Sequence, residues 1–163
     1  MASALSRFRV LDLSRVLAGP SCTQILADLG AEVIKIERPG TGDDTRGWGP
    51  PYLTAADDSD TSEAGYYLSA NRGKQSVCVD ISHPSGQSVI RDLALKSDVL
   101  VENFKVGGLR KYGLDYESLS RINKRLIYCS ITGFGQDGPD SARPGYDFMI
   151  QGCLLYTSPS PRD

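Results

Sequence analysis

The sequence is poor in the residues that metal and redox sites need. It has a single histidine, which cannot build a His-rich metal site or a two-histidine relay, and its four cysteines form no C-x-x-C pair. Zinc ribbons and thioredoxin-like motifs are therefore excluded, and we expect no bound metal. His83 precedes Pro84 at an expected helix start, where a solvated loop residue is the favoured interpretation. Cys22, Cys78 and Cys129 lie among apolar neighbours and are predicted to be small core residues of a protein in a reducing compartment.

Long apolar runs and strong net charge are also absent. No stretch approaches the roughly 18 apolar residues that a membrane-spanning helix needs. The 18 basic and 20 acidic residues leave a net charge of -2, which gives no electrostatic reason to expect nucleic acid or a membrane as a partner. Arg7, Arg9, Asp12 and Arg15 interrupt the N-terminal apolar residues, so no signal peptide is expected. A strand-like segment from Phe8 leaves little room for a mitochondrial presequence, and we expect a cytoplasmic protein.

The 163 residues are enough for one domain with a core, and they alternate between two hydrophobic periods. Period-two segments predict strands at 9–13, 32–37, 76–81, 98–104 and 126–131. Apolar residues three or four apart predict helices around 22–29, 66–68, 84–93 and 116–122. Ser21 is a candidate N-cap of the first helix, and Gly30 is predicted to end it. Such strand–helix alternation predicts a parallel α/β sheet.

Residues 38–64 break this alternation. Glycine and proline punctuate an acidic, Thr-rich stretch without periodicity, which predicts a long loop. Asp43 and Asp44 within it are a candidate acid–base pair. The favoured interpretation is structural, with both carboxylates pairing with Arg46 and capping local backbone.

Ligands of an open parallel sheet bind at the carboxyl ends of its strands, where this sequence gathers glycines, charges and aromatic residues. The turn 14–21 leads into a helix N-terminus, which favours phosphate. It lacks the G-x-G-x-x-G fingerprint, so a plain strand–helix turn is favoured there. Arg38 directly follows the second strand, where a guanidinium suits a phosphate or an adenine face, or is only a solvated charge.

A second group of candidate residues follows the fourth strand. Lys105, Arg110 and Lys111 come after Asn103 and Phe104, and three cations beside an amide and an aromatic ring are a candidate phosphate and adenine rim. A solvated helix face explains the same charges nearly as well. The residues alone therefore indicate a parallel α/β domain that binds a phosphate-bearing cofactor, without indicating a reaction.

Several motifs occur in a fixed order along the chain: VLDLSRVLAGP (10–20), LGAEVIKIERPG (29–40), GDDTR (42–46), NRGK (71–74), VENF (101–104) and TGFG (132–135). From about Phe8 to Asp147 they resemble the opening of the class III CoA-transferases, the family of formyl-CoA, carnitine and dicarboxylate CoA-transferases. The resemblance implies a Rossmann-like parallel sheet with helices on both faces, the truncated N-terminal part of the family's large domain. It implies coenzyme A or acyl-CoA and a small carboxylic acid as substrates, and an interlocked homodimer for the full-length protein.

The resemblance also implies CoA contacts at eight positions. Carried over motif by motif, they are Leu17, Ala18, Arg38, Asn103, Phe104, Lys111, Arg143 and Tyr146. Two of them depart from the family pattern. Formyl-CoA transferase has a glutamine where this chain has Leu17, which argues against formyl or oxalyl chemistry. Lys111 replaces an arginine, which keeps the charge but loses the fork geometry for phosphate.

The family reaction uses an aspartate whose carboxylate attacks the donor thioester and then forms an aspartyl-CoA thioester. The resemblance implies that this nucleophile lies C-terminal to residues 145–147, beyond the truncation, so no residue of the chain is assigned as catalytic and Asp147 is expected to be structural. A sister branch, the α-methylacyl-CoA racemases, has a histidine base at the place of Tyr146. Tyrosine is a poor base at neutral pH, so the transferase is favoured. A non-catalytic CoA- or nucleotide-binding module is the remaining alternative.

Three segments are predicted along the chain. Residues 1–147 form the CoA-binding part, and residues 148–152 begin a truncated segment. Residues 153–163 match the translation of a common sequencing adapter and are expected to be a non-native tail that packs against nothing. The piece on its own is expected to be inactive.

Overall fold

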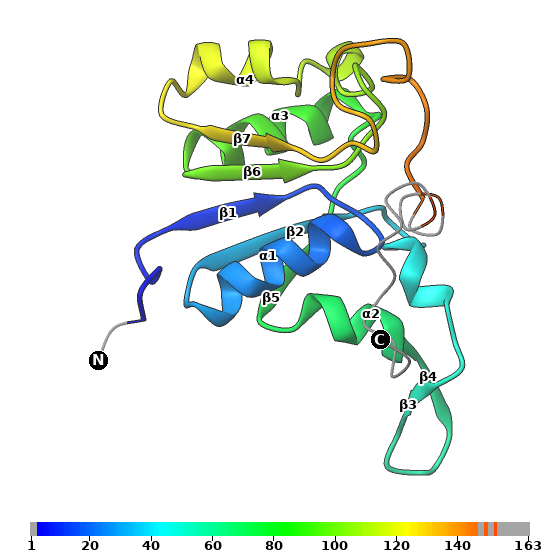
Figure 1. Cartoon of the computed structure of the whole chain (residues 1–163). Helices are drawn as coiled ribbons and strands as arrows, with labels where there is room; N and C mark the ends of the chain where they lie inside the picture. The colour runs from blue at the N-terminus through cyan, green and yellow to red at the C-terminus, as the bar shows by residue number, and fades with distance from the viewer. Residues whose placement is uncertain (1–2, 147–148, 150–151, 153–163) are drawn as a thin grey trace.

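The computed structural model describes residues 3–146, 149 and 152 (Figure 1). In chain order its elements are β1 (Arg9–Asp12), α1 (Ala18–Asp28), β2 (Glu32–Glu37), η1 (Asp44–Gly47), β3 (Tyr52–Thr54), β4 (Asp60–Ala64), α2 (Gly65–Asn71), β5 (Lys74–Cys78), α3 (Pro84–Leu95), β6 (Val99–Glu102), η2 (Arg110–Tyr112), α4 (Tyr116–Ile122) and β7 (Ile127–Ser130). Five strands form one sheet in the order β5-β2-β1-β6-β7, and all of its pairs are parallel. The predicted parallel α/β sheet is confirmed.

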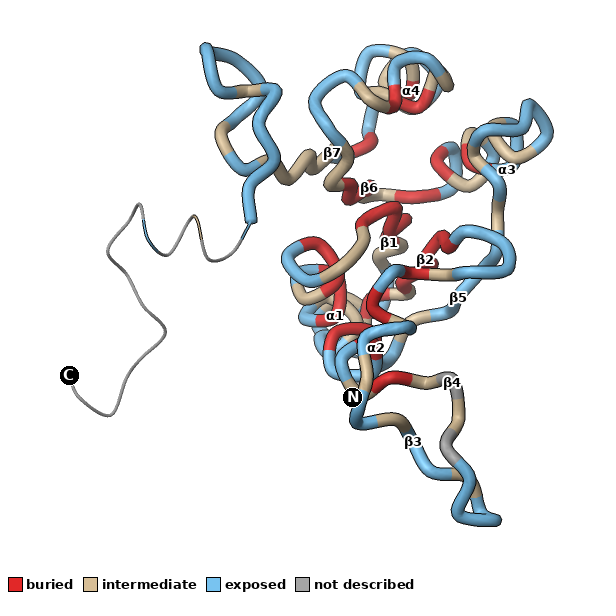
Figure 2. The backbone as a smooth tube through the Cα atoms, turned by 90° about the vertical axis from the view of Figure 1, so that its right-hand side faces the viewer, coloured by how far each residue is buried: buried red, intermediate tan, exposed pale blue. Residues whose placement is uncertain are grey.

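Helices cover both faces of this sheet, because successive strand residues point to opposite sides. One face packs against α3 and α4 through a cluster that includes Leu11, Ile34, Ile90, Leu100 and Leu119. The opposite face packs against α1 through a smaller cluster of Val10, Val33, Val101, Leu26 and Ala27. Buried residues gather in the inner strands β1, β2 and β6 (Figure 2).

Helix α1 begins earlier than the sequence predicts. It starts at Ala18, three residues before the predicted Ser21 cap. The dipeptide Gly19-Pro20 is typical of a loop turn, but here it belongs to the first turn of the helix. Proline is tolerated there because the first N–H groups of a helix have no hydrogen-bond partner within it. Gly30 follows the helix as predicted, with a φ of 98° that only glycine adopts without strain.

The buried face of α1 differs from the predicted one. Ile25 and Leu29 of the expected apolar stripe are 59% and 47% exposed, whereas Thr23 and Gln24 are buried. The reason is that the buried carboxylate of Asp12 lies in the sheet under this helix and requires a hydrogen-bond donor. Thr23 supplies that donor through its hydroxyl at 2.5 Å.

The prediction that the cysteines are core residues is wrong for two of the three described. Cys22 and Cys78 are exposed and Cys129 is half-buried, and all three are free thiols. Cys22 belongs to α1. Cys78 and Cys129 belong to β5 and β7, the two edge strands of the sheet, which have a neighbour on one side only. Apolar sequence neighbours therefore did not imply burial.

Residues 38–64 are not a featureless loop. They contain η1 and the antiparallel hairpin β3–β4, which projects from the rest of the molecule (Figures 1 and 2). The third predicted strand lies at 74–78 rather than 76–81. Within the described residues no helix is both long and apolar enough to cross a bilayer. The predicted segments 148–152 and 153–163 lie outside the described residues, apart from Met149 and Gly152.

Candidate functional site

A cavity of about 890 Å³ opens at the carboxyl ends of the central strands. Its walls come from the segments that follow β1, β2, β5 and β6, as parallel topology dictates for a ligand site. Its lining residues are Leu13, Arg15, Ile36, Glu37, Arg38, Pro39, Gly42, Asp43, Val79, Asp80, Ile81, Ser82, Phe104, Lys105, Gly107, Gly108, Lys111 and Tyr112.

Three of the eight predicted CoA contacts meet in this cavity. Arg38, Phe104 and Lys111 come from positions up to 73 residues apart in the sequence and line the same walls. Arg15 and Lys105 join them there. Sequence reasoning did not single out Arg15, although it lies inside the 10–20 motif.

Asn103 was expected in the same crevice and does not line it. Its side chain is turned toward the backbone of the β1–α1 loop. The Arg15 N–H donates to Asn103 Oδ1 at 2.9 Å, and Asn103 Nδ2 donates to Arg15 O at 2.7 Å. A carboxamide has one acceptor and one donor group, and this pair of bonds uses both. Asn103 therefore fixes a loop that borders the cavity.

The other four predicted contacts also lie outside the cavity lining. Leu17 and Ala18 are exposed at the start of α1. Arg143 forms an ion pair with Asp140 at 3.0 Å, and Tyr146 is 67% exposed. The structure thus brings together the basic and aromatic residues after β2 and β6, and leaves these four apart from them.

The cavity carries an excess of available positive charge. Its four cations are Arg15, Arg38, Lys105 and Lys111. Arg15 lies over the Phe104 ring at 5.4 Å and forms an ion pair with Asp44 at 3.2 Å. In the part of the chain that the structure describes, Arg38, Lys105 and Lys111 form no ion pair.

The acids of the cavity, in contrast, already have partners. Glu37 accepts two bonds from Arg46, and Asp43 accepts one from Lys35. Asp80 accepts from the N–H and hydroxyl of Ser82, and these bonds lower the pKa of Asp80. The net field in the cavity therefore favours an anion.

A second cavity of about 860 Å³ lies beside η2 and α4. Its lining includes four acids, Glu102, Asp115, Glu117 and Asp137, against two cations, Lys105 and Arg110. Arg110 lies 3.9 Å from both Asp115 and Glu117. This balance disfavours a polyphosphate ligand, so the cavity lined by Arg38 is the better candidate for one.

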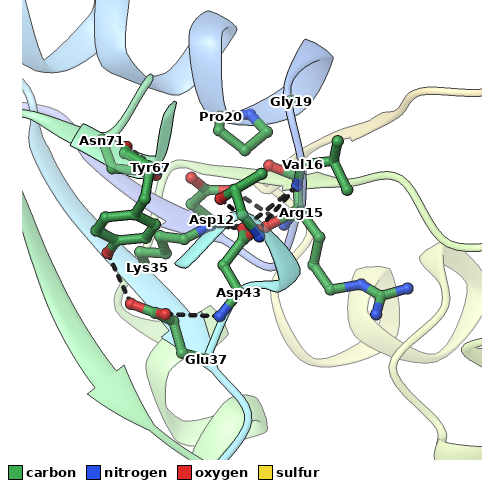
Figure 3. Close-up of polar contacts among 12 residues, drawn as sticks. Asp12, Arg15, Val16, Gly19, Pro20, Lys35, Glu37, Asp43, Tyr67 and Asn71 are labelled. Carbon is green, nitrogen blue, oxygen red and sulfur yellow. Dashed lines mark hydrogen bonds and ion pairs between the residues drawn. The ribbon is translucent and has the colours of Figure 1, made fainter. Parts of the chain in front are cut away.

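Beneath the cavity, the α1 side of the sheet holds buried charges (Figure 3). Lys35 has a side chain only 1% exposed, and its Nζ donates to Asp43 Oδ2 and to Ser14 O, each at 2.9 Å. Burial alone would raise the pKa of Asp43, but the Lys35 ammonium and the hydrogen bonds from Thr45 together outweigh burial and lower it. Asp43 also accepts from the N–H of Thr45 at 3.0 Å, which caps η1.

The predicted capping role of Asp43 is therefore confirmed, while its predicted partner is wrong. Arg46 binds Glu37 and Glu63 instead, and Asp44 pairs with Arg15. The physical reason is that a buried carboxylate requires a buried counter-charge, and Lys35 on β2 is the cation beneath it.

Glu37 is the most densely bonded acid of the site. It accepts from Arg46, from the Tyr67 hydroxyl at 2.8 Å and from the Ser76 hydroxyl at 2.6 Å, as well as from the Asp43 N–H at 2.8 Å. Burial alone would raise the pKa of Glu37, but these hydrogen bonds outweigh it and lower the pKa to about 2. Glu37 is thus ionised at neutral pH, and its hydrogen bonds connect β2 to η1, α2 and β5.

Asp12 and Lys74 form a second buried pair. Lys74 Nζ lies 3.1 Å from Asp12 Oδ2 and also donates to Pro20 O at 2.8 Å and to Asn71 Oδ1 at 2.9 Å. Burial lowers the pKa of Lys74, and Asp12 acts in the opposite direction. Asp12 also accepts from the hydroxyls of Ser14 and Thr23.

Sequence reasoning missed this polar network, although a signal was present. Asp12 in VLDL and Lys35 in EVIKIE directly follow apolar residues of inner strands. A strand between two neighbours buries both faces, so a charge inside such a run indicates a buried partner. In the described part of the chain, no group of three or more Asp, Glu, His or Cys side chains is placed to hold a metal ion.

Comparison with known proteins identifies relatives of this chain. A family model described as CoA-transferase family III matches residues 5–157. The chain is 56% identical over 154 residues to a succinate–glutarate CoA-transferase of Agrobacterium fabrum, covering 94% of this chain and 38% of that protein. It is 50% identical over 162 residues to the human succinyl-CoA:glutarate CoA-transferase, covering 98% of this chain and 35% of that one.

A solved structure shows the same fold. The crystal structure of a CaiB/BaiF family protein from Brucella suis superposes with a TM-score of 0.88 at 52% identity, covering 94% of this chain and 39% of that one. The chain therefore spans less than two-fifths of the length of these proteins.

Proposed function

The chain belongs to CoA-transferase family III, and from this premise we propose that it is the CoA-binding part of an enzyme that moves CoA from an acyl-CoA to a small carboxylic acid. The cationic cavity at the strand carboxyl ends carries the proposal. Two relatives are named for succinate or succinyl-CoA and glutarate, which supports succinyl-CoA as the donor and a dicarboxylate as the acceptor.

Each group in the cavity has a role that its chemistry suits. CoA carries phosphates and an adenine ring, and Arg38, Lys105 and Lys111 supply charge for the phosphates. Phe104, with the Arg15 guanidinium 5.4 Å from its ring centroid, offers an aromatic surface for the base. These residues bind and orient the cofactor and leave the chemistry to a carboxylate.

We place that nucleophilic carboxylate outside this chain. Family resemblance assigns it to an aspartate, whose attack on the thioester splits one difficult acyl transfer into easier steps. The buried acids described above are engaged in ion pairs, and none is assigned this role. The interlocked homodimer, the cytoplasmic location and the contacts at Leu17, Ala18, Arg143 and Tyr146 stay predictions.

Arg38→Ala is expected to weaken CoA binding about tenfold or more, because a charged hydrogen bond contributes about 1.5–3 kcal/mol. Titration calorimetry of the 163-residue chain with CoA measures the effect. Arg125→Ala, which removes an exposed arginine outside the cavity lining, is the matched control and should bind as the parent does. Equal affinities for parent and Arg38→Ala would mean that Arg38 is only a solvated strand-end charge.

The 163-residue chain alone is expected to form no glutaryl-CoA from succinyl-CoA and glutarate. A longer protein that contains it and the family's aspartate should form this product, and substitution of that aspartate by alanine should abolish transfer with CoA affinity kept. Mass spectrometry of the acyl-CoA pool measures both. Exchange of the α-proton of a 2-methylacyl-CoA in heavy water, without transfer, would favour the racemase alternative instead.

A further inference from the structure

Val16 has a backbone conformation that its side chain opposes. Its φ is 69°, in the left-handed region, where a β-branched residue is a strong outlier. The other described non-glycine residue with positive φ is Asp58, with a φ of 61°. Aspartate tolerates this region, and Asp58 lies between the strands of the β3–β4 hairpin, where such turns are ordinary. The strain at Val16 therefore needs a separate explanation.

Three buried or half-buried side chains bind the backbone around Val16, and two of them, Lys35 and Asp43, are labelled in Figure 3. Lys35 Nζ binds Ser14 O at 2.9 Å, and Asn103 binds both backbone polar groups of Arg15. The Val16 N–H itself donates to the Asp43 carboxylate, with both oxygens at 3.3 Å. These partners come from β2, the segment after β6 and the start of η1. Several independent contacts therefore fix the backbone of this segment, and a strained conformation persists only where the surrounding contacts fix it in this way.

The strained residue lies where the chain turns from the sheet to the cavity wall. β1 ends at Asp12, and α1 begins at Ala18, so residues 13–17 make the whole reversal. Arg15, directly before Val16, lines the cavity, and its side chain points away from the buried cluster (Figure 3). A change of φ at Val16 would redirect the segment that joins Arg15 to the helix start.

We propose that Val16 is a positioning residue for CoA. Lys35, Asp43 and Asn103 hold it in the left-handed conformation, and its β-branched side chain leaves the backbone fewer alternative conformations than glycine would have. The segment 15–18 is then ordered before the cofactor arrives, so binding has less conformational entropy to lose. This inference rests on the proposed function, since it takes CoA as the ligand of the cavity.

The test is Val16→Gly in the 163-residue chain, with Asp58→Gly as the matched control. Glycine adopts positive φ freely, so both substitutions remove the conformational strain of a left-handed residue. Neither should lower the melting temperature by more than about 2 °C. Val16→Gly should weaken CoA binding about three- to tenfold by calorimetry, because the freed loop must be ordered on binding. Amide hydrogen exchange at residues 15–18 should speed up. Asp58→Gly should change neither affinity nor exchange at those residues.

Unchanged CoA affinity in Val16→Gly would overturn the inference, and so would a loss of affinity accompanied by a large fall in melting temperature, which would show an effect through the fold. If the parent chain bound CoA and the variant matched it, only this inference would fail. If the parent chain gave no CoA binding, the proposed function would fail, and the inference would fall with it.

Discussion

Lys35→Met is expected to lower the free energy of unfolding by about 3–5 kcal/mol, the range for removing one partner of a buried ion pair. The Lys35 and Asp43 side chains are 1% and 0% exposed and 2.9 Å apart. Methionine fills similar volume but leaves the Asp43 carboxylate buried without a counter-charge and Ser14 O without its donor. Urea unfolding followed by circular dichroism measures the loss.

Two further variants separate the ion pair from packing. In Lys35→Met/Asp43→Asn the uncompensated charge is gone, so we expect part of the lost stability to return. Arg72→Met removes the cation of an exposed ion pair, in which Arg72 Nη2 lies 2.6 Å from Asp28 Oδ2. This variant should change the unfolding midpoint little. A loss below about 1 kcal/mol in Lys35→Met would contradict the description of this pair as a buried anchor.

Acid is expected to destabilise the protein through Glu37. Hydrogen bonds hold the pKa of Glu37 at about 2 in the folded state, below its ordinary value of 4.5. A lowered pKa contributes stability that is present above the unfolded value and is lost as the pH falls through the folded one. Because the residue is 4% exposed, about 3 kcal/mol should be lost between pH 4.5 and about pH 2.

Urea unfolding at several pH values between 2 and 6 measures this dependence. Glu37→Gln should reduce the slope of unfolding free energy against pH in that window, with the remainder due to other acids such as Asp43, whose pKa is also lowered. Glu63→Gln, which alters the more exposed partner of the same Arg46, is the control and should keep the parent slope. An identical slope for parent and Glu37→Gln would show that Glu37 is not the titrating group.

The sheet could be predicted from the sequence because most of its strands contain short apolar runs. The expected strands at 9–13, 32–37, 98–104 and 126–131 contain β1, β2, β6 and β7. The hairpin β3–β4 was missed because its strands are rich in Thr, Ser and acidic residues and have no alternation. The start of α1 was missed because Gly-Pro indicates a turn until the following helix is seen to continue through it.

The site could be predicted in part for a related reason. Parallel topology brings strand ends together, so Arg38, Phe104 and Lys111 could be expected to meet although they are distant in sequence. Asn103 could not be distinguished from them, because its position after the same strand is equally compatible with an amide that faces a cavity and one that binds a backbone. The pairing of Lys35 with Asp43 joins a strand to the loop after it, and periodicity carries no information about such a contact.

The central claim, that the cavity after β2 and β6 binds CoA, is tested most directly by mapping CoA binding on the chain. Two-dimensional amide spectra of the ¹⁵N-labelled 163-residue protein, titrated with CoA, report the perturbed residues. We predict the largest shifts at Arg38, Phe104, Lys105, Gly107 and Lys111. An absence of shifts, or shifts confined to the acidic cavity around Glu102 and Asp115, would contradict the account.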